Sequence, residues 1–223
     1  GYIKLDRFAQ SSNTEFEEAL AKLKAQKMKS LILDLRGNTG GYLNVAADLG
    51  NQFLKDDVTI VYTEGEKSPK QVFKTNKKGK FTDGKLIVLI DEGSASASEI
   101  VSGAIQDWDR GVLIGRRSFG KGLVQRPFKL PDGSQVRLTT ARYYTPTGRC
   151  IQRSYEKGSE DYFNEMTKRM KHGEFYHSDS IQFPDSLKYS TLLSKRTVYG
   201  GGGIMPDIFM PVDTTFATQL YSD

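Results

Sequence analysis

Residues 91–99 decide the fold, and they read Asp-Glu-Gly-Ser-Ala-Ser-Ala-Ser-Glu. The segment before them, 85–90, is a short apolar run that is typical of a buried strand. After them, apolar residues recur at helical spacing from Ile100 to Trp108, which predicts a helix with one buried face. A strand that turns directly into a helix places the turn at a sheet edge and at the positive end of a helix dipole. That position suits an anion, or a nucleophile whose reaction creates one.

Strand and helix patterns alternate along the first half of the chain. Thr14 and Glu17 have capping-box spacing at the start of the first predicted helix. This order of elements predicts an α/β fold with a mainly parallel sheet covered by helices and with antiparallel additions. The predicted strands are 2–5, 30–36, 58–62, 85–90 and 111–115, and the predicted helices are 14–28, 43–53 and 100–108.

Several segments fall outside this alternation. Residues 63–84 are polar and punctuated by glycine, which predicts a hairpin that projects from the body. Residues 123–145 alternate about a Pro-Asp-Gly turn and predict a β-hairpin. Residues 150–200 are polar, with a modest helix at 159–172, and we interpret them as an insertion or a segment that covers the body. The glycines at 200–203 predict a flexible run before a last β-like piece at 208–212.

The composition is typical of a globular protein, with 37% hydrophobic and 26% charged residues in a chain of 223. The length allows one domain or two small ones. The net charge of +5 is mild, and we interpret its densest patch, residues 74–80, as a solvated hairpin tip and not as a nucleic-acid site. A single cysteine, Cys150, excludes an internal disulfide. With only His172 and His177 besides, no metal site is predicted.

A second dense stretch, residues 115–122, reads Gly-Arg-Arg-Ser-Phe-Gly-Lys-Gly and has three interpretations. A Walker phosphate loop needs Ser or Thr after its lysine and then a helix, whereas Gly122 and a strand pattern follow Lys121. A Ser-x-x-Lys motif of the penicillin-binding type belongs on a helix, which is not predicted here. In the third interpretation, Lys121 is the base for a distant serine. Because lysine has an unperturbed pKa of about 10.4, its amine must then be desolvated, and the neighbouring Phe119 and Leu123 are expected to exclude water.

Four segments in order closely resemble the motifs of the carboxyl-terminal processing (tail-specific) serine peptidases. They are residues 34–41, 93–99, 118–125 and 199–207, and together they span most of the chain. The resemblance implies a crotonase-like α/β catalytic domain over residues 1–223. It also implies a serine endopeptidase of the Ser–Lys type that cleaves near protein C-termini through an acyl-enzyme, with no metal or organic cofactor.

The resemblance also implies the role of each site residue. Ser96 corresponds to the nucleophile, Lys121 to the general base, and Gln125 to a residue that orients the lysine. Strand alternation agrees with the last assignment, because positions 121 and 125 share a face if the strand is regular. The oxyanion hole is implied to consist of the amide of Ala97 and an amide of the glycine-rich turn. The two candidates in that turn are Gly40 and Gly41.

Structural interpretations stand beside these roles. Ser96 and Glu99 have capping-box spacing, so Ser96 is also a candidate helix cap. Ser94 and Ser98 are interpreted as turn and helix-surface residues. Asp34 and Arg36 are interpreted as a structural pair that fixes the glycine turn.

The resemblance extends to partners and location. The family usually carries a PDZ-like domain before its catalytic core, and we read this chain, which opens at Gly1 in mid-strand, as a fragment without it. The implied substrates are proteins or peptides with apolar C-terminal tails, the implied location is the periplasm or cell envelope, and a homo-oligomer is possible. The alternatives from other classes are a non-catalytic peptide-binding or scaffold domain of the same fold, and a phosphate-binding domain around Lys121.

Overall fold

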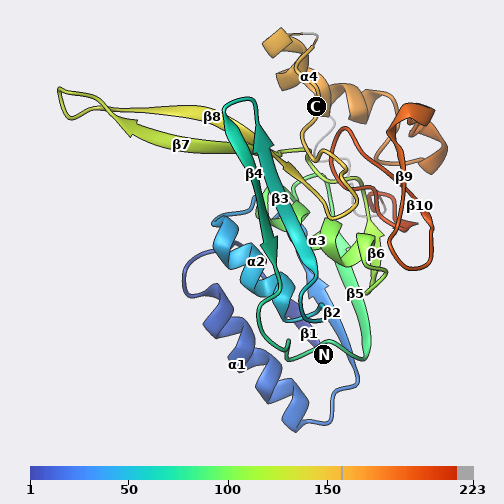
Figure 1. Ribbon diagram of the computed structural model, residues 1–223. Coiled ribbons are helices and arrows are strands. Elements are labelled where there is room, and N and C mark those ends of the chain that lie inside the picture. Colours follow the sequence, from blue (N-terminus) through green and yellow to red (C-terminus); the bar gives the residue numbers. More distant parts are fainter. Residues whose placement is uncertain (157, 215–223) are drawn as a thin grey trace, which may run out of the picture.

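The computed structural model describes residues 1–156 and 158–214, and a five-stranded parallel sheet lies at its centre (Figure 1). The middle strand, β5, is the apolar run that precedes the serine-rich turn, and it pairs with β2 on one side and β6 on the other. All pairings in this sheet are parallel, as the alternation of strands and helices predicts. The strand order is β1 (Tyr2–Lys4), β2 (Ser30–Asp34), β5 (Lys85–Ile90), β6 (Val112–Gly115) and β11 (Ile208–Phe209).

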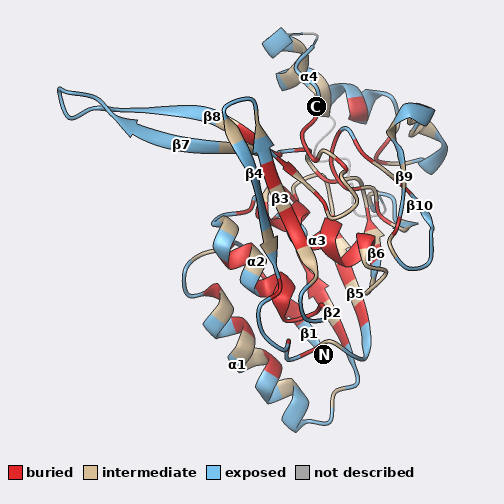
Figure 2. Cartoon of the chain, viewed as in Figure 1, coloured by how far each residue is buried: buried red, intermediate tan, exposed pale blue. Residues whose placement is uncertain are grey.

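Three helices bury one face of this sheet: α1 (Ser12–Ala25), α2 (Leu43–Asn51) and α3 (Ala97–Asp107). Every residue of α3 is buried, so this helix lies in the middle of the molecule (Figure 2). The sheet contributes alternate residues such as Leu33 and Val88 to the same core, and both are fully buried. The α/β fold expected from the sequence is therefore confirmed.

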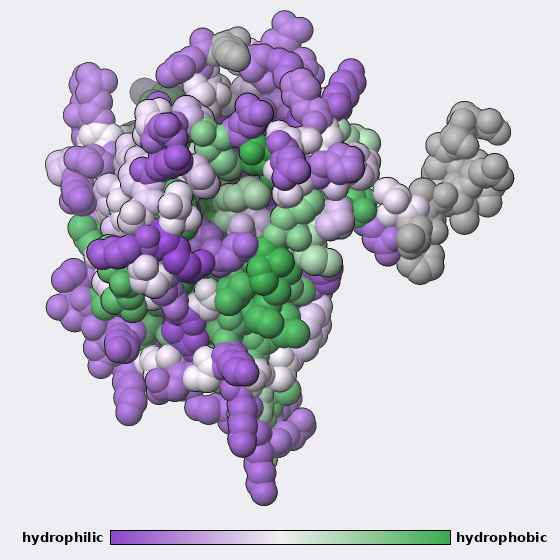
Figure 3. Space-filling model, turned by 90° about the vertical axis from the view of Figure 1, so that its right-hand side faces the viewer, coloured by the Kyte–Doolittle hydropathy of each residue, from purple (hydrophilic) through white to green (hydrophobic). Residues whose placement is uncertain are grey.

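The other face of the parallel sheet is only partly covered. Tyr2, Val112 and Ile208 are 53%, 40% and 49% exposed, and the intervening Ile32 and Ile87 are half-buried. Figure 3 shows a hydrophobic area on the side of the molecule where β5 and β6 lie. The apolar side chains of this face are thus incompletely removed from water.

A second, antiparallel sheet has the strand order β4-β3-β8-β7. It contains both predicted hairpins, but their positions differ from the prediction. The hairpin that projects from the body is β7–β8, whereas β3–β4 lies along α2 and α3 (Figure 1). The strands are β3 (Thr59–Gly65), β4 (Ser68–Lys74), β7 (Leu123–Lys129) and β8 (Gln135–Tyr144).

The basic patch at 74–80 is not a hairpin tip, so that interpretation was wrong. β4 ends at Lys74, and the chain then folds back onto the body, where Thr75 is buried. A Cβ on Gly79 would lie 2.4 Å from the carbonyl oxygen of Asn51. The segment is therefore packed against the end of α2, and the Lys80 ammonium forms an ion pair with Glu17 of α1.

The first helix begins two residues earlier than its capping-box spacing predicts. The Ser12 hydroxyl accepts a hydrogen bond from the Ala9 amide and donates one to the Arg7 carbonyl. These bonds fix the entry to α1 before Thr14, which lies inside the helix. Sequence spacing alone did not show this alternative start.

Residues 150–156 and 158–207 connect β8 to β11 and include α4 (Gly158–Lys171), β9 (Lys188–Ser190), β10 (Thr197–Tyr199) and two short 3₁₀ turns, Ser178–Ser180 and Asp185–Leu187. The glycine run at 200–203 is not a flexible linker, because Gly201 and Gly203 donate hydrogen bonds to the carbonyls of Cys150 and Ile151. Within the described residues, no helix has the length and apolar character needed to cross a membrane. The end of the domain predicted over 1–223 lies outside the described residues.

Candidate active site

Two turns meet where β2 and β5 end, at the carboxyl edge of the parallel sheet. We call residues 37–41 the glycine turn and residues 91–96 the serine turn. The Ala95 amide donates to the Asn38 carbonyl over 2.9 Å, and the Gly37 amide donates to Asp91 Oδ1 over 2.8 Å. The Ser98 hydroxyl, from the first turn of α3, also donates to the Asn38 carbonyl, over 2.8 Å. The two turns are therefore held against each other by bonds along their length.

The three serines of this region have different environments. Ser94 is fully buried and donates its hydroxyl proton to the Leu35 carbonyl over 2.8 Å, which agrees with its interpretation as a turn residue. Ser98 is also fully buried, so its interpretation as a helix-surface residue was wrong. Ser96 is partly exposed and lies directly before α3. Its φ of +55° is a conformation that residues with a side chain rarely adopt, and such strain is concentrated at functional sites.

Gly40 and Gly41 differ in what their amides do. The Gly40 amide donates to Asn38 Oδ1 over 2.9 Å, so it is already engaged. Among the described residues, no acceptor is recorded for the amides of Gly41 and Ala97. A Cβ on Gly40 would lie 2.9 Å from the Ala97 nitrogen, so Gly40 itself lies close to the start of α3. Of the two glycines, Gly41 has the amide that is available to a ligand.

Glu99 connects the serine turn to the loop of residues 116–122, which we call the lysine loop. Its side chain is fully buried. Oε2 accepts hydrogen bonds from the amides of Ser96, over 2.7 Å, and Lys121, over 2.8 Å. Oε1 accepts from the Ser118 hydroxyl and the Gly120 amide, both over 2.6 Å. Because Ser96 and Lys121 donate to the same oxygen, their backbones are close in space although they are distant in sequence.

Burial and hydrogen bonding act in opposite directions on Glu99. Burial raises the pKa of its carboxyl group, and the bonds from Ser118, Lys121, Gly120 and Ser96 counteract that rise. Such a carboxylate is costly to bury unless each oxygen has partners, and here each oxygen has two.

Lys121 and Gln125 are both exposed. The expectation that flanking residues bury the Lys121 amine was therefore wrong for the described part of the chain, and the ring of Phe119 instead stacks under the Arg153 guanidinium at 4.2 Å. β7 begins at Leu123, after Lys121, and its pairing with β8 is irregular between Val124 and Gln125. Strand alternation therefore does not fix how Lys121 faces Gln125, and the role of Gln125 stays a prediction.

Asp34 and Arg36 form a structural pair, as interpreted from the sequence. The buried Asp34 carboxylate accepts two bonds from the Arg36 guanidinium, over 3.0 and 2.7 Å, and one from the Tyr2 hydroxyl over 2.7 Å. Burial acts to raise the pKa of Asp34, but these bonds outweigh it and lower that pKa. The pair fixes the end of β2, from which the glycine turn departs.

Sequence reasoning left Glu99 and Ser118 out of the site. For Glu99 the available signal was its capping-box spacing from Ser96, which left two interpretations open, a helix cap or a contact with the site, and Glu99 was assigned no role. Ser118 was considered only as a Ser-x-x-Lys nucleophile, but it is fully buried, and its hydroxyl bridges Glu99 and the Ile204 amide. Both residues are buried and connect the serine turn, the lysine loop and Ile204 through hydrogen bonds.

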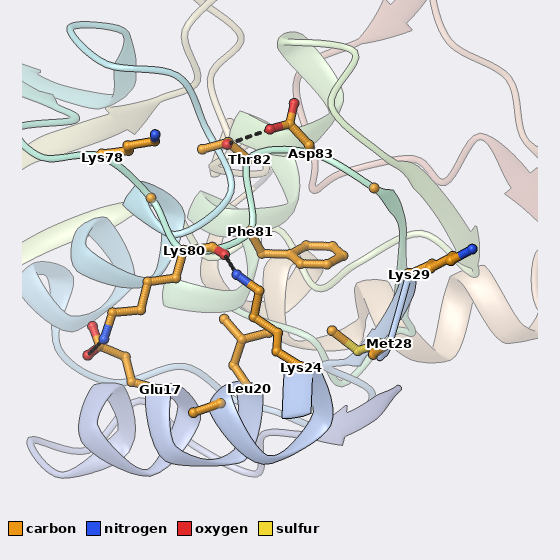
Figure 4. A pocket seen from close by; sticks show the side chains of 13 residues that line it. Glu17, Leu20, Lys24, Met28, Lys29, Lys78, Lys80, Phe81, Thr82 and Asp83 are labelled. Carbon is orange, nitrogen blue, oxygen red and sulfur yellow. Dashed lines mark hydrogen bonds and ion pairs between the residues drawn. The ribbon is translucent and has the colours of Figure 1, made fainter. Parts of the chain in front are cut away.

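The cavity drawn in Figure 4 lies away from these turns. It has a volume of about 570 Å³ and lies between α1 and the segment 78–84, where Lys24 donates to the Lys80 carbonyl over 2.6 Å. None of its lining residues belongs to the glycine turn, the serine turn or the lysine loop. Among the residues the structure describes, no three His, Cys, Asp or Glu side chains gather as a metal site needs.

Comparison with known proteins identifies the family of this chain. The profile of peptidase family S41 matches residues 1–158. The carboxyl-terminal-processing protease of Synechocystis is 42% identical over 146 residues, which cover 66% of this chain and 34% of the relative. The carboxy-terminal processing protease CtpB of Bacillus subtilis is 34% identical over 191 residues, which cover 84% of this chain and 37% of the relative.

A solved structure shows the same relationship. The photosystem II D1 C-terminal processing protease superposes with a TM-score of 0.68 and 26% identity, over 95% of this chain and 42% of that one. The chain thus spans between a third and two fifths of the length of the two curated relatives. On the match of the family profile to most of its residues, the chain belongs to peptidase family S41.

Proposed function

We propose that this chain carries the catalytic site of a serine endopeptidase that cleaves proteins near their C-termini through an acyl-enzyme. The observation that carries the proposal is the conformation of Ser96. It has a strained backbone at the N-terminus of α3, beside the amides of Ala97 and Gly41, for which no acceptor is recorded among the described residues. A nucleophile beside preorganised donors is the arrangement that acyl transfer requires.

In the proposed reaction, Ser96 Oγ attacks the scissile carbonyl carbon while the neutral amine of Lys121 accepts the hydroxyl proton. The carbonyl oxygen becomes an oxyanion, which the amides of Ala97 and Gly41 stabilise. The intermediate collapses to an acyl-enzyme as protonated Lys121 returns its proton to the leaving amine. Water then attacks the ester with the same base. Gln125 is proposed to orient the lysine, as the resemblance implies.

The exposure of Lys121 sets a requirement on this reaction. A lysine amine becomes a base near neutral pH only when it is desolvated. We propose that a bound peptide covers Lys121 and supplies this desolvation, so the base becomes active only with substrate present. The short connection through Glu99 supports this, because it already holds the lysine backbone beside Ser96.

Substrates and location follow the names of the relatives and are proposals for this chain. The relatives are named as carboxyl-terminal processing proteases, one of them chloroplastic in Arabidopsis and others bacterial. We propose protein substrates with apolar C-terminal tails, and a location in the periplasm or cell envelope. A preceding PDZ-like domain and a homo-oligomer remain predictions.

The test compares wild type with Ser96→Ala and Lys121→Arg. We expect Ser96→Ala to abolish both cleavage of a peptide with an apolar tail, scored by mass, and covalent labelling by a fluorophosphonate, while its thermal unfolding is unchanged. Lys121→Arg keeps the positive charge but not the base, because guanidinium does not deprotonate in this range. Normal turnover by Lys121→Arg would exclude Lys121 as the base. Labelling and cleavage that survive in Ser96→Ala would exclude Ser96 as the nucleophile, whereas no cleavage and no labelling by the wild type would favour the non-catalytic alternative.

A further inference from the structure

The lysine loop is enclosed by a part of the chain that the family profile does not match. That profile ends at residue 158, whereas α4 and the turn after it lie at 158–177. Arg169, near the end of α4, is 4% exposed, and Glu174, just beyond the helix, is 6% exposed. Their burial is unusual, since charged side chains are seldom fully buried unless they are paired.

Arg169 uses all three nitrogens of its guanidinium. Nη1 donates to the Ser118 carbonyl over 3.1 Å, and Nη2 donates to the Arg117 carbonyl over 2.8 Å. Nε donates to Glu174 Oε1 over 2.8 Å. One planar group therefore binds two consecutive carbonyls of the lysine loop and is itself held by a buried carboxylate.

Glu174 completes the arrangement from the other side. It accepts a two-pronged ion pair from the Arg117 guanidinium, with both distances 2.7 Å. The lysine loop is thus bound at Arg117 twice, through its carbonyl by Arg169 and through its guanidinium by Glu174. Burial and the neighbouring Arg117 charge lower the pKa of Arg169 to about 10, against the opposing effect of Glu174. Arg169 is therefore protonated at neutral pH.

The glycine run closes the loop from a third direction. The Ser118 amide donates to the Ile204 carbonyl over 3.1 Å, and the Ile204 amide donates to Ser118 Oγ over 2.6 Å. A Cβ on Gly203, whose φ is +92°, would lie 2.7 Å from the Ser118 carbonyl oxygen. Only glycine allows the backbones to approach so closely.

These contacts lead to the site through Ser118. Its carbonyl accepts from Arg169, and its hydroxyl donates to Glu99, which holds the amides of Lys121 and Ser96. The path from α4 to the backbone of Lys121 therefore consists of two buried hydrogen bonds and a last, partly buried one to the Lys121 amide. Arg169 has no contact with Ser96 or Lys121 among the recorded bonds, so it acts through other residues.

We propose that Arg169 and Glu174 are positioning residues, and that the end of α4 holds the lysine loop in the position that brings the Lys121 amine to the Ser96 hydroxyl. This inference rests on the proposed function. An arginine is required because its rigid fork reaches two carbonyls and a carboxylate at once, which a lysine ammonium on a flexible stem does not do. A displacement of about 1 Å at the base lowers turnover by roughly a hundredfold.

The experiment compares Arg169→Lys and Arg169→Ala with the matched control Arg149→Lys. Arg149 is 1% exposed and bound to the buried Asp107, but its recorded bonds do not include the lysine loop. We expect both residue 169 variants to lose roughly 10–100-fold in kcat with KM within about twofold of wild type. The pH–kcat profile of Arg169→Lys should also shift on its acid limb, where the base titrates. Arg149→Lys should unfold at a lower temperature but keep kcat and the profile.

Chemical rescue distinguishes a loss of Lys121 positioning from a loss of stability. Ethylguanidinium at millimolar concentration should raise the kcat of Arg169→Ala at least about fivefold, since it offers the same planar donors. Ethylammonium should not raise it. If Arg169→Ala does not fold, Arg169→Lys and Glu174→Gln give the same comparison of kcat, KM and pH profile. Wild-type kcat and pH profile in these variants, with Ser96→Ala inactive, would overturn the inference and leave the proposed function standing. Activity in Ser96→Ala would overturn the proposed function first.

Discussion

Replacement of Glu99 by glutamine tests the connection between the serine turn and the lysine loop. The substitution keeps the size of the side chain and removes one of its two acceptor oxygens. In the wild type, the carboxylate accepts four hydrogen bonds, two on each oxygen. An amide group presents one oxygen and one NH₂, so it cannot satisfy four donors.

The structure indicates which orientation the amide takes. With its oxygen toward the amides of Ser96 and Lys121, its NH₂ faces the Ser118 hydroxyl, which can turn to accept, and the Gly120 amide, which cannot. The reverse orientation leaves both Ser96 and Lys121 without an acceptor. The first orientation is therefore favoured, and it leaves one buried amide unsatisfied.

One unsatisfied buried amide costs about 1–3 kcal/mol. Loss of the buried charge offsets part of this cost, because burial disfavours the ionised Glu99, as its raised pKa indicates. We expect Glu99→Gln to lower the free energy of unfolding by about 1–2 kcal/mol, which corresponds to about 2–8 °C in Tm for a chain of this size. Because the unsatisfied donor is next to Lys121, kcat should fall roughly 10–100-fold with little change in KM.

The assay measures kcat and KM on a peptide with an apolar tail, the fluorophosphonate labelling rate and the unfolding temperature. The matched control is Asp107→Asn, a fully buried carboxylate at the other end of the same helix that binds Arg149 and Thr147. We expect the control to lose stability and keep kcat. A Glu99→Gln variant with lower Tm and wild-type kcat would refute the reasoning, because the bonds would then stabilise the fold without positioning the base.

Two further predictions concern the glycine turn and acid stability. In Gly40→Ala, where φ is +101°, the added methyl would lie 2.8 Å from the Ser96 Cβ, so labelling of Ser96 should slow by about tenfold or more. The control is Gly133→Ala, where φ is +85° and no atom lies within 4 Å of the added methyl. It should lose only about 1–2 kcal/mol of stability and keep its labelling rate. Burial opposes the ionisation of Asp109, but bonds from Ser194 and Arg196 outweigh it and lower the pKa of Asp109 to about 2. Since that pKa is below the unfolded value of about 3.9, the ionised group stabilises the fold by about 2 kcal/mol above pH 4, and this is lost as the pH falls toward 2. In urea unfolding, Asp109→Asn should therefore be less stable than wild type at pH 7, with a difference that shrinks below pH 4; a constant difference would contradict this.

The central β5–turn–α3 unit could be predicted because its signals are local. An apolar run gives the strand, helical spacing gives the helix, and the small residues between them give the turn. The direction of the hairpins could not be predicted in the same way, because residues 63–84 and 123–145 both contain turn signals that indicate a hairpin and neither contains a signal for its direction. Which one projects depends on contacts of the returning chain, and Thr75 and Phe81 find buried positions on the body.

The site was predictable in its local part and not in its long-range part. Ser96 stands out because a serine at a strand–helix turn has a position that suits a nucleophile. Glu99 stands three residues later, and spacing alone makes it a cap. Its bonds to Ser118, Gly120 and Lys121 depend on how the lysine loop returns to α3, and no local pattern encodes that return.

Residues 150–200 gave few core signals for a physical reason. Their contacts with the lysine loop are made mainly by buried charges, Arg169 and Glu174, and not by an apolar face. Pattern methods score such residues as surface, because charged side chains are seldom buried. Buried ion pairs stabilise a fold weakly compared with apolar packing of equal volume, but they tolerate few geometries. Buried charges held in this way restrict the position of the loop that they contact, which is the property that a base opposite a nucleophile requires.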